Sequence, residues 1–494
     1  MLGQKTLLLN PPLINGVAFT RQGRCQERDD VLGTTKPPYT LALLAQLLRH
    51  AGCEVRLVDA TIERLSIQDV IRKLDDERFE PTLILFPSTT PTLDVDAAEV
   101  GRLKTRYGAP IFCFGPHAST VPQLAMARSP QVDGMFVGEP EGAAVQLATL
   151  GSILELGAVA SLTWRSADGS VVPHRAHGSY SGFLDAPYPA WDLLPLAKYV
   201  LPLVDKPYVI VETSRGCPYS CDFCVAPIHQ GHKFRERSAK SLVDEIERNH
   251  REHGIEFFYL WGDTVTLNVK SFTAFCDELI ARRLPIQWFG NARADNLTDP
   301  AFVHRLKRAG CWMLALGIET ESEDVRKNMI KRLERQKIQT AFRNMREAGI
   351  RSFAFFIFGY PGETLATMDQ TVEYAIELDP DFANFYPAVP YPGTGLYEKC
   401  LRDGLLPADA RDDWSRMEYS YYVLEGNGLN HRVVMAAINR AKRRFFLRPS
   451  YVTRHIGDLA RLAVTKRAIA WQVASRTLFG TEPLVTRDAI RDAR

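Results

Sequence analysis

Two series of short apolar segments, each alternating with stretches of helical spacing, limit the fold class of this chain to α/β. Continuous apolar runs of this length are typical of strands that are buried on both faces of a parallel sheet. The first series predicts strands at residues 6–10, 54–59, 82–87, 110–115 and 133–138. Together with the intervening helices, it predicts a five-stranded, doubly wound, Rossmann-like domain over residues 1–150, with a ligand crevice at the carboxyl ends of its strands.

The second series predicts a partial barrel. Its strands are expected at residues 208–216, 256–263, 286–293, 312–320, 351–359 and 382–390. Six βα units in a row indicate a partial (βα)6 barrel over residues 205–400, and such barrels keep their chemistry at the carboxyl ends of the strands. Residues 151–204 are expected to form a linker, and residues 401–494 a helical C-terminal domain.

Composition excludes several classes of protein. The 494 residues contain 46% hydrophobic and 24% charged residues, and 60 Lys and Arg against 58 Asp and Glu leave a net charge of +2. A dedicated nucleic-acid binder is usually clearly basic, so no nucleic-acid partner is expected. No apolar stretch approaches the length of a membrane span, and the N-terminal apolar run is too short for a secretory signal. We therefore expect a cytoplasmic protein.

One connection in the first domain is unusually long. Residues 11–38 separate the first predicted strand from the helix that should follow it. Most βα loops have about two to six residues, and much longer ones tend to be functional. We therefore expect this loop to have a functional role.

Three of the nine cysteines lie together directly after the first barrel strand. Cys217, Cys221 and Cys224 form a CxxxCxxC pattern in the sequence RGCPYSCDFCVAP. Iron–sulfur clusters normally use four cysteines, so three thiolates leave one iron open to a ligand that is not protein. A structural zinc site is the alternative, but it usually needs a second ligand pair, and none is visible. The remaining cysteines are scattered and are expected to be reduced thiols: Cys25, Cys53, Cys113, Cys276, Cys311 and Cys400.

Residues 205–400 resemble the radical S-adenosylmethionine (SAM) superfamily, because further family positions recur at successive strand ends. The resemblance implies that these positions bind SAM: Phe223, Trp261, Gly262, Asp263, Arg293, Glu319, Gly359, Tyr360 and Pro361. The chain departs from the family at Asp263, which replaces a glutamate and so has a shorter reach. A zwitterionic sulfonium needs carboxylate, arginine and backbone partners near the open iron, and these positions supply them.

The first domain is similar to the cobalamin-binding domain that precedes the barrel in one branch of this superfamily. The resemblance assigns cobalamin contacts to Asn10, Pro12, Ser88, Thr89, Thr90, Gly115, Pro116, His117, Gly138, Glu139 and Glu141. The small and hydroxyl-bearing residues among them leave room for a nucleotide tail at the strand ends. A dinucleotide-binding domain fits less well, since no G-x-G-x-x-G follows the first strand.

The histidine that ligates cobalt in methyl-transfer enzymes of the D-x-H-x-x-G type is missing after the first strand. His50 is expected inside a helix, and His117 follows the fourth strand. We therefore expect base-off cobalamin without a histidine ligand below the cobalt. Both histidines are expected to have structural roles.

The combination resembles cobalamin-dependent radical SAM enzymes, the group that includes anaerobic bacteriochlorophyll cyclase, hopanoid-modifying enzymes and natural-product C-methyltransferases. It implies methylation of an unactivated carbon of a small-molecule or lipid-like metabolite by way of a 5′-deoxyadenosyl radical and methylcobalamin, with an external reductant of the flavodoxin or ferredoxin type. The alternative is a cyclisation, rearrangement or hydroxylation without methyl transfer. A non-catalytic cobalamin or redox sensor is a third hypothesis, but no degraded cluster loop or DNA-binding domain supports it.

Substrate-binding or catalytic residues are expected near the open side of the barrel. Tyr386 and Tyr391 are the candidate catalytic residues, with Thr394 beside them. The alternative is that they close the packing of the barrel. The basic, partly amphipathic segment 439–467 suggests either a membrane surface or an anionic substrate, and the alternative is a solvated helix face.

Overall fold

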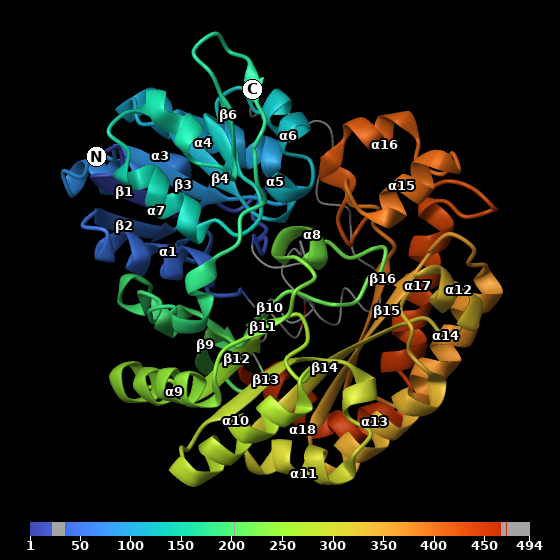
Figure 1. Ribbon diagram of the computed structural model, residues 1–494. Coiled ribbons are helices and arrows are strands. Elements are labelled where there is room, and N and C mark those ends of the chain that lie inside the picture. The colour runs from blue at the N-terminus through green and yellow to red at the C-terminus, as the bar shows by residue number, and fades with distance from the viewer. Residues whose placement is uncertain (22–34, 202, 466–470, 472–494) are drawn as a thin grey trace.

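The computed structural model describes residues 1–21, 35–201, 203–465 and 471. Figure 1 shows an N-terminal α/β domain (blue to teal) above an open barrel (green to orange), with the C-terminal helices (red) packed against the barrel. Cys25 and residues 22–34 of the long loop lie outside the described residues, so the prediction for that loop is untested there. Within the described residues, no helix is both long and apolar enough to cross a membrane.

The N-terminal sheet has the strand order β2-β1-β3-β4-β5-β6-β7. Its parallel strands confirm the five predicted ones: β1 (Lys5–Asn10), β2 (Glu54–Asp59), β3 (Leu83–Pro87), β4 (Ile111–Phe114) and β5 (Gly134–Phe136). The prediction of a plain linker after residue 150 was wrong in part, because β6 (Leu162–Arg165) and β7 (Val171–Val172) extend the sheet by antiparallel pairing. Both are shorter than typical strands, so their apolar pattern is weak.

Helices cover both faces of this sheet. They are α1 (Tyr39–His50), α2 (Ala60–Glu63), α3 (Ile67–Asp76), α4 (Leu93–Tyr107), α5 (Pro116–Thr120), α6 (Pro122–Arg128) and α7 (Glu141–Thr149). Between β1 and β3 the chain order reverses, and a ligand crevice opens at such a point of a doubly wound sheet.

The second sheet has seven strands in the order β16-β15-β14-β13-β12-β9-β8. Six of them are the predicted barrel strands. They are β9 (Lys206–Glu212), β12 (Phe257–Trp261), β13 (Gln287–Ala292), β14 (Cys311–Glu319), β15 (Arg351–Phe358) and β16 (Phe382–Pro387). All six pair in parallel, and the short β8 (Val200–Leu201) adds an antiparallel edge beside β9. Since β16 and β8 do not pair, the barrel stays open.

Helices cover the outside of this barrel, and a small hairpin sits at its rim. The helices are α9 (Ala239–His253), α10 (Val269–Arg282), α11 (Pro300–Arg308), α12 (Glu323–Asn328), α13 (Arg335–Ala348) and α14 (Leu365–Leu378). The short helix α8 (Ala226–Gln230) lies instead at the rim, between the barrel and the N-terminal domain (Figure 1). The hairpin is β10 (Ser214–Arg215) with β11 (Arg235–Glu236). Partly exposed and buried side chains alternate along β15, so one sheet face packs under the helices while the other lines the barrel interior.

Local side-chain chemistry sets the helix boundaries. Ser238, Asn268 and Thr364 each accept a hydrogen bond from a backbone N–H of the first turn of α9, α10 and α14. Gly254 ends α9 and Gly349 ends α13 in the left-handed conformation, which glycine adopts without a steric penalty. These boundaries place the strand ends, and the loops that follow them, on one rim of the barrel.

The C-terminal region is helical, as expected, as far as the structure describes it. Its helices are α15 (Gly395–Arg402), α16 (Ala408–Asp412), α17 (His431–Phe446) and α18 (Pro449–Thr465). Trp414, just after α16, packs edge-on against His117 with 4.3 Å between ring centroids, and Arg128 stacks on the same indole. The C-terminal region therefore contacts the N-terminal domain as well as the barrel.

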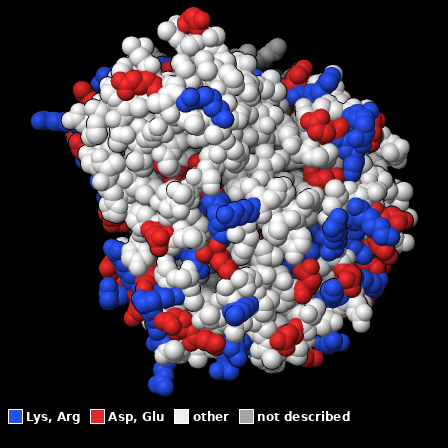
Figure 2. Space-filling model, viewed as in Figure 1, with Lys and Arg blue, Asp and Glu red and all other residues white. Residues whose placement is uncertain are grey.

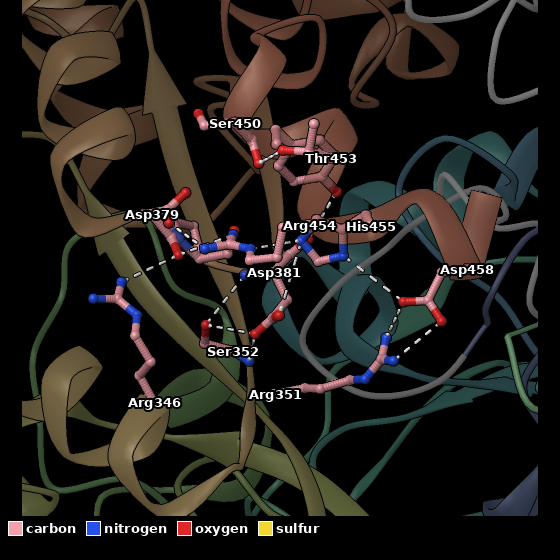
Figure 3. Close-up of polar contacts among 12 residues, drawn as sticks. Arg346, Arg351, Ser352, Asp379, Asp381, Ser450, Thr453, Arg454, His455 and Asp458 are labelled. Atoms are coloured by element: carbon pink, nitrogen blue, oxygen red, sulfur yellow. Dashed lines mark hydrogen bonds and ion pairs between the residues drawn. The ribbon is translucent and has the colours of Figure 1, made fainter.

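Helix α18 docks at the amino ends of β15 and β16 through a polar network (Figure 3). Arg351 at the start of β15 donates to both carboxylate oxygens of Asp458, at 2.8 and 3.1 Å. Arg454 pairs with Asp379, and Ser352 donates to Asp381. The helix is thus fixed to the end of the barrel opposite the cysteine loop.

Arginines of the basic C-terminal segment form ion pairs in the structure. Arg440 pairs with Asp369, Arg444 with Glu373, and Arg448 and Arg454 with Asp379. These contacts join the segment to α14 and the loop after it. On the face seen in Figure 2, charges of both signs intermingle, and no large patch of one sign is visible.

The network of Figure 3 gives a stability prediction. Asp458→Asn should lower the free energy of unfolding by about 1 kcal/mol, because it removes the ion pair with Arg351. The loss is modest because this pair is partly exposed, and exposed pairs contribute less than buried ones. Chemical denaturation of the purified protein measures the change. Glu323→Gln, which removes an exposed pair on α12, is the matched control and should change stability by less than about 0.5 kcal/mol. Equal losses in both variants would contradict the docking role of Asp458.

Candidate functional site

The three clustered cysteines lie on one loop between the hairpin strand β10 and helix α8. Cys217 is buried, Cys221 and Cys224 are partly exposed, and none of the three forms a disulfide with another described cysteine. The N–H of Cys224 donates to the carbonyl of Cys221 at 3.1 Å, which turns the loop tightly. The loop lies at the carboxyl end of β9, the barrel rim where the sequence predicts the chemistry.

Asp222, between two of these cysteines, ties the loop to the rest of the barrel. Its Oδ2 accepts hydrogen bonds from the Tyr360 hydroxyl at 2.5 Å and from Lys399 Nζ at 2.8 Å. The carbonyl of Asp222 also accepts from the N–H of Leu396. The cysteine loop is therefore held by residues far away in the sequence, and a lone aspartate or lysine gives no sequence signal of such a role.

The described residues contain no group of three His, Cys, Asp or Glu side chains that converges on a single metal ion. A mononuclear zinc site requires such convergence. In an iron–sulfur cube, by contrast, each cysteine binds a different iron, so the thiols surround the cluster and do not meet at one point. Three thiols on one short, anchored loop fit the second arrangement.

The predicted SAM positions lie at the strand ends around this loop. Gly262 follows β12, where an added Cβ would stand 2.6 Å from Ser214 Oγ, so only glycine fits between the two strand ends. Asp263 follows it, and Trp261 ends β12. The structure therefore brings the turn after the second barrel strand against the segment that leads into the cysteine loop.

Arg293, after β13, connects the third strand to the cysteine loop. Its guanidinium stacks on the ring of Tyr219 at 3.8 Å and donates to Asp295 at 3.0 and 3.1 Å. Tyr219 lies between the first two cysteines. The arginine is thus buried at the predicted site, with its orientation set by its own loop.

Glu319 ends β14 in a left-handed backbone conformation, with φ of +71°. This conformation is uncommon for residues other than glycine and clusters at functional sites. Its carboxylate accepts a hydrogen bond from Lys331 Nζ at 2.7 Å. Lys331 is a site residue that the sequence analysis missed, because it lies in an irregular segment without a motif.

The turn after β15 is built around a buried carboxylate. Glu363 accepts from the N–H of Gly359 at 2.7 Å and from that of Tyr360 at 3.3 Å. Burial raises the pKa of Glu363 to about 8. The Tyr422 hydroxyl donates to the Gly359 carbonyl, and its ring lies where a Cβ on Gly359 would be. Pro361 follows in the same turn; Glu363 and Tyr422 were not identified from the sequence.

A crevice opens in the N-terminal domain where the strand order reverses. It has an empty volume of about 380 Å³ and is lined by strand-end residues Asn10, Pro87 and Phe114 and by hydroxyls and cations of the loop before α1. Buried Arg21 pairs with Asp96 beneath it, at 2.8 Å. A nucleotide tail with a phosphate and a ribose fits this mixture of apolar walls and polar donors, so the residues suit the expected cobalamin.

The other predicted cobalamin residues form the wall beside this crevice. Gly115 has φ of +129°, and a Cβ there would stand 2.4 Å from the Ser88 carbonyl oxygen. Thr90 Oγ1 lies 3.0 Å from His117 Nδ1, while His117 Nε2 has no hydrogen-bond partner among the described residues. Burial lowers the pKa of His117 to about 3, so its ring is neutral. Pro12, Thr89 and Pro116 lie at the same strand ends, and His50 ends α1, as predicted.

Gly138 and Glu139 lie in the turn between β5 and α7, which faces the barrel, and Glu141 begins α7. Glu139 and Glu141 contact Arg215 of β10, and a cavity with an empty volume of about 390 Å³ beside them is lined by both domains. Ser119 Oγ accepts a hydrogen bond from the N–H of Gly138 and also lies 2.9 Å from His229 Nδ1 of α8. The carboxyl edges of the two sheets therefore face a common interface.

The candidate catalytic tyrosines have different surroundings. Tyr386 on β16 stacks with Phe355 and Tyr419 in the aromatic lining of the barrel. Tyr391 is buried in the loop that follows. Thr394 accepts from the N–H of Tyr397 and so caps α15, a structural role. Phe223, in the cysteine loop, is partly buried against the core.

Comparison with known proteins agrees with this two-domain arrangement. Residues 30–148 match the B12 binding domain and residues 211–375 match the Radical SAM superfamily. The chain is 28% identical to an uncharacterized methyltransferase of Pyrococcus horikoshii, over 86% of this chain and 91% of that protein. It is 27% identical to the anaerobic magnesium-protoporphyrin IX monomethyl ester cyclase of Cereibacter sphaeroides, over 83% of this chain and 67% of the cyclase.

A solved structure shares the fold. The radical SAM methyltransferase TsrM of Kitasatospora setae, determined with cobalamin and a 4Fe–4S cluster bound, superimposes with a TM-score of 0.64. The two chains are 21% identical, and the match covers 81% of this chain and 78% of TsrM.

The cysteine loop predicts selective loss of iron. Cys217→Ala, Cys221→Ala and Cys224→Ala should each reduce the iron and sulfide bound after anaerobic reconstitution, because each removes a thiolate from the cluster. Iron and sulfide analysis of the purified variants measures the loss. Cys276→Ala is the control, since burial raises the pKa of that thiol to about 12 and keeps it protonated. Retained iron in the three loop variants would refute the assignment.

Glu363 predicts a pH dependence of stability. Its pKa in the folded protein, about 8, lies above the ordinary value of 4.5, so the folded state holds the proton over a wider pH range. The contribution of the neutral carboxyl to stability is present below about pH 4.5 and is lost as the pH rises through 8. Relative to Glu363→Gln, the wild type should therefore lose unfolding free energy between pH 5 and pH 9. Parallel denaturation curves across this range would contradict the raised pKa.

Proposed function

Because the chain belongs to the cobalamin-dependent radical SAM enzymes, with a B12-binding domain followed by a radical SAM domain, we propose that it is a methyltransferase acting on an unactivated carbon. Its cofactors are cobalamin, a 4Fe–4S cluster and SAM. The substrate class that we propose is a small-molecule or lipid-like metabolite. Methyltransferases are prominent among its relatives, including the cytidylyl-2-hydroxyethylphosphonate methyltransferase of Streptomyces wedmorensis.

One observation carries this proposal: the carboxyl edges of both sheets meet at one interface. The crevice of the N-terminal domain lies at the carboxyl ends of its strands, the cysteine loop lies at the carboxyl end of β9, and a cavity between them is lined by both domains. A substrate held between them reaches a radical source and a methyl donor without leaving the protein. Such positioning contributes roughly 7–11 kcal/mol to an otherwise bimolecular step.

The bound cofactors supply the chemistry: reductive cleavage of SAM at the cluster produces the hydrogen-abstracting radical, and cobalamin carries the methyl group. The protein's own residues hold and orient these groups. Asp222, Tyr360 and Lys399 anchor the cluster loop. Lys331 orients Glu319, and Glu363 shapes the turn before α14. Aromatic side chains, among them Tyr386 and Phe355, line the barrel interior and exclude water from it.

Two electrons must enter from outside for each methyl group transferred, one to cleave SAM and one to return cobalamin to the state that accepts a methyl group. We propose an external one-electron donor of the flavodoxin or ferredoxin type. The aromatic lining of the barrel suits a substrate with a large apolar part, and Tyr386 and Tyr391 remain the candidate catalytic residues on its open side.

Product analysis tests the proposed reaction. Incubation with SAM, a chemical reductant and candidate metabolites should give one S-adenosylhomocysteine and one 5′-deoxyadenosine for each methyl group added. Liquid chromatography with mass spectrometry measures all three. A product without an added methyl group, with 5′-deoxyadenosine and no S-adenosylhomocysteine, would assign the chain to the cyclase-like alternative that the Cereibacter sphaeroides relative represents.

A further inference from the structure

Arg215 lies two residues before the first cluster cysteine and is surrounded by three buried carboxylates. Its Nε and Nη2 donate to Glu212 Oε2 at 3.0 and 2.8 Å, and its Nη2 also donates to Glu141 Oε1 at 2.6 Å. Its Nη1 lies 3.4 Å from Glu139 Oε2. Each of the four side chains is at most 3% exposed. The contacts therefore form in the interior, where charge interactions are least screened.

These carboxylates come from two domains. Glu212 ends β9 of the barrel, whereas Glu139 lies between β5 and α7 of the N-terminal domain and Glu141 is the first residue of α7. Arg235, on the hairpin strand beside Arg215, also pairs with Glu139 and donates to the Gln230 carbonyl. Both strands of the β10–β11 hairpin thus form ion pairs with Glu139 of the other domain.

The hairpin leads directly into the cysteine loop. Gly216 separates Arg215 from Cys217, and its φ of +82° and close approach to the Lys233 carbonyl, 2.2 Å from an added Cβ, leave the backbone little freedom there. The N–H of Cys217 donates to the Gly231 carbonyl at 3.2 Å. A displacement of Arg215 is therefore transmitted to the first cysteine.

Buried ion pairs add little net stability compared with apolar packing, but removing one partner leaves a buried charge uncompensated. In some proteins such pairs specify one arrangement of the groups that they join. The Arg215 cluster is placed for this purpose, because it joins the segment after β5 of the N-terminal domain to the strand β10, which leads into the cysteine loop.

We propose that Arg215, through its ion pairs with Glu139 and Glu141, is a positioning residue that sets where the cysteine loop lies relative to the cobalamin-binding domain. The purpose of this device rests on the proposed function, which needs both cofactors at one cavity. Glu139 and Glu141, which the sequence resemblance assigns to cobalamin, pair with Arg215 in the structure. The role is testable without knowing the substrate.

The test uses the reconstituted protein with two paramagnetic centres, the reduced cluster and cob(II)alamin. Pulsed electron paramagnetic resonance gives the distribution of distances between them. Cobalamin content is measured first in each variant. In the Arg215→Gln and Glu141→Gln molecules that hold both cofactors, the distribution should broaden or shift by about 1 Å or more, a displacement on the scale that impairs catalysis. Loss of cobalamin from Glu141→Gln with an unchanged distance in Arg215→Gln would overturn the proposal, because Glu141 would then serve the cofactor directly. Glu141→Gln is informative because Glu141 contacts the cysteine segment only through Arg215 among the described residues.

Glu245→Gln is the matched control. Glu245 forms an equally buried ion pair with Arg237, but both partners belong to the barrel, so the distance distribution should stay as in the wild type. The Arg215→Gln/Glu141→Gln double variant should be no broader than the broader single variant, because the two changes break the same contact.

An unchanged distribution in both single variants would overturn the proposal. So would loss of cluster iron in Arg215→Gln with an unaltered Glu141→Gln protein, since Arg215 would then serve the cysteine loop alone. If Arg215→Gln fails to fold, the Glu141→Gln result alone decides between these outcomes. The measurement needs no substrate, so a failure of the methyltransferase proposal would leave its result intact.

Discussion

The buried contact between Arg215 and three glutamates is the constraint on which the arrangement of this enzyme depends. Each domain alone is an ordinary α/β unit with a crevice or rim at the carboxyl ends of its strands. Charged groups without exposure to water need their partners, so this contact permits few alternative docking angles between the two sheets. Its consequence is that the N-terminal crevice and the cysteine loop open toward one interface.

Around that interface, the barrel rim depends on a few unusual backbone positions. Gly262 lets β12 end against Ser214, Gly359 makes room for the Tyr422 ring, and Glu319 adopts a left-handed conformation that Lys331 supports. The rigid α/β framework and the helix that docks at its opposite end hold these positions in place (Figure 3).

Much of this architecture could be predicted from the sequence, because buried parallel strands leave continuous apolar runs and the cysteine spacing is specific. All six barrel strands and the cysteine loop were found in this way. The partners of the loop could not be found, since Asp222 meets Lys399 across 177 positions of chain and neither residue carries a pattern. The short strands β6 and β7 were not predicted for a related reason: strands of two to four residues are too short to show a hydrophobic periodicity.

The central claim is that both cofactors occupy one cavity between the two domains. An anaerobic crystal structure with cobalamin and SAM bound tests it most directly. We expect the nucleotide tail of cobalamin to enter the crevice beside Asn10 and Phe114. We expect its corrin ring to face the cluster held by Cys217, Cys221 and Cys224. A corrin ring bound away from the barrel, with SAM at a separate surface, would contradict it.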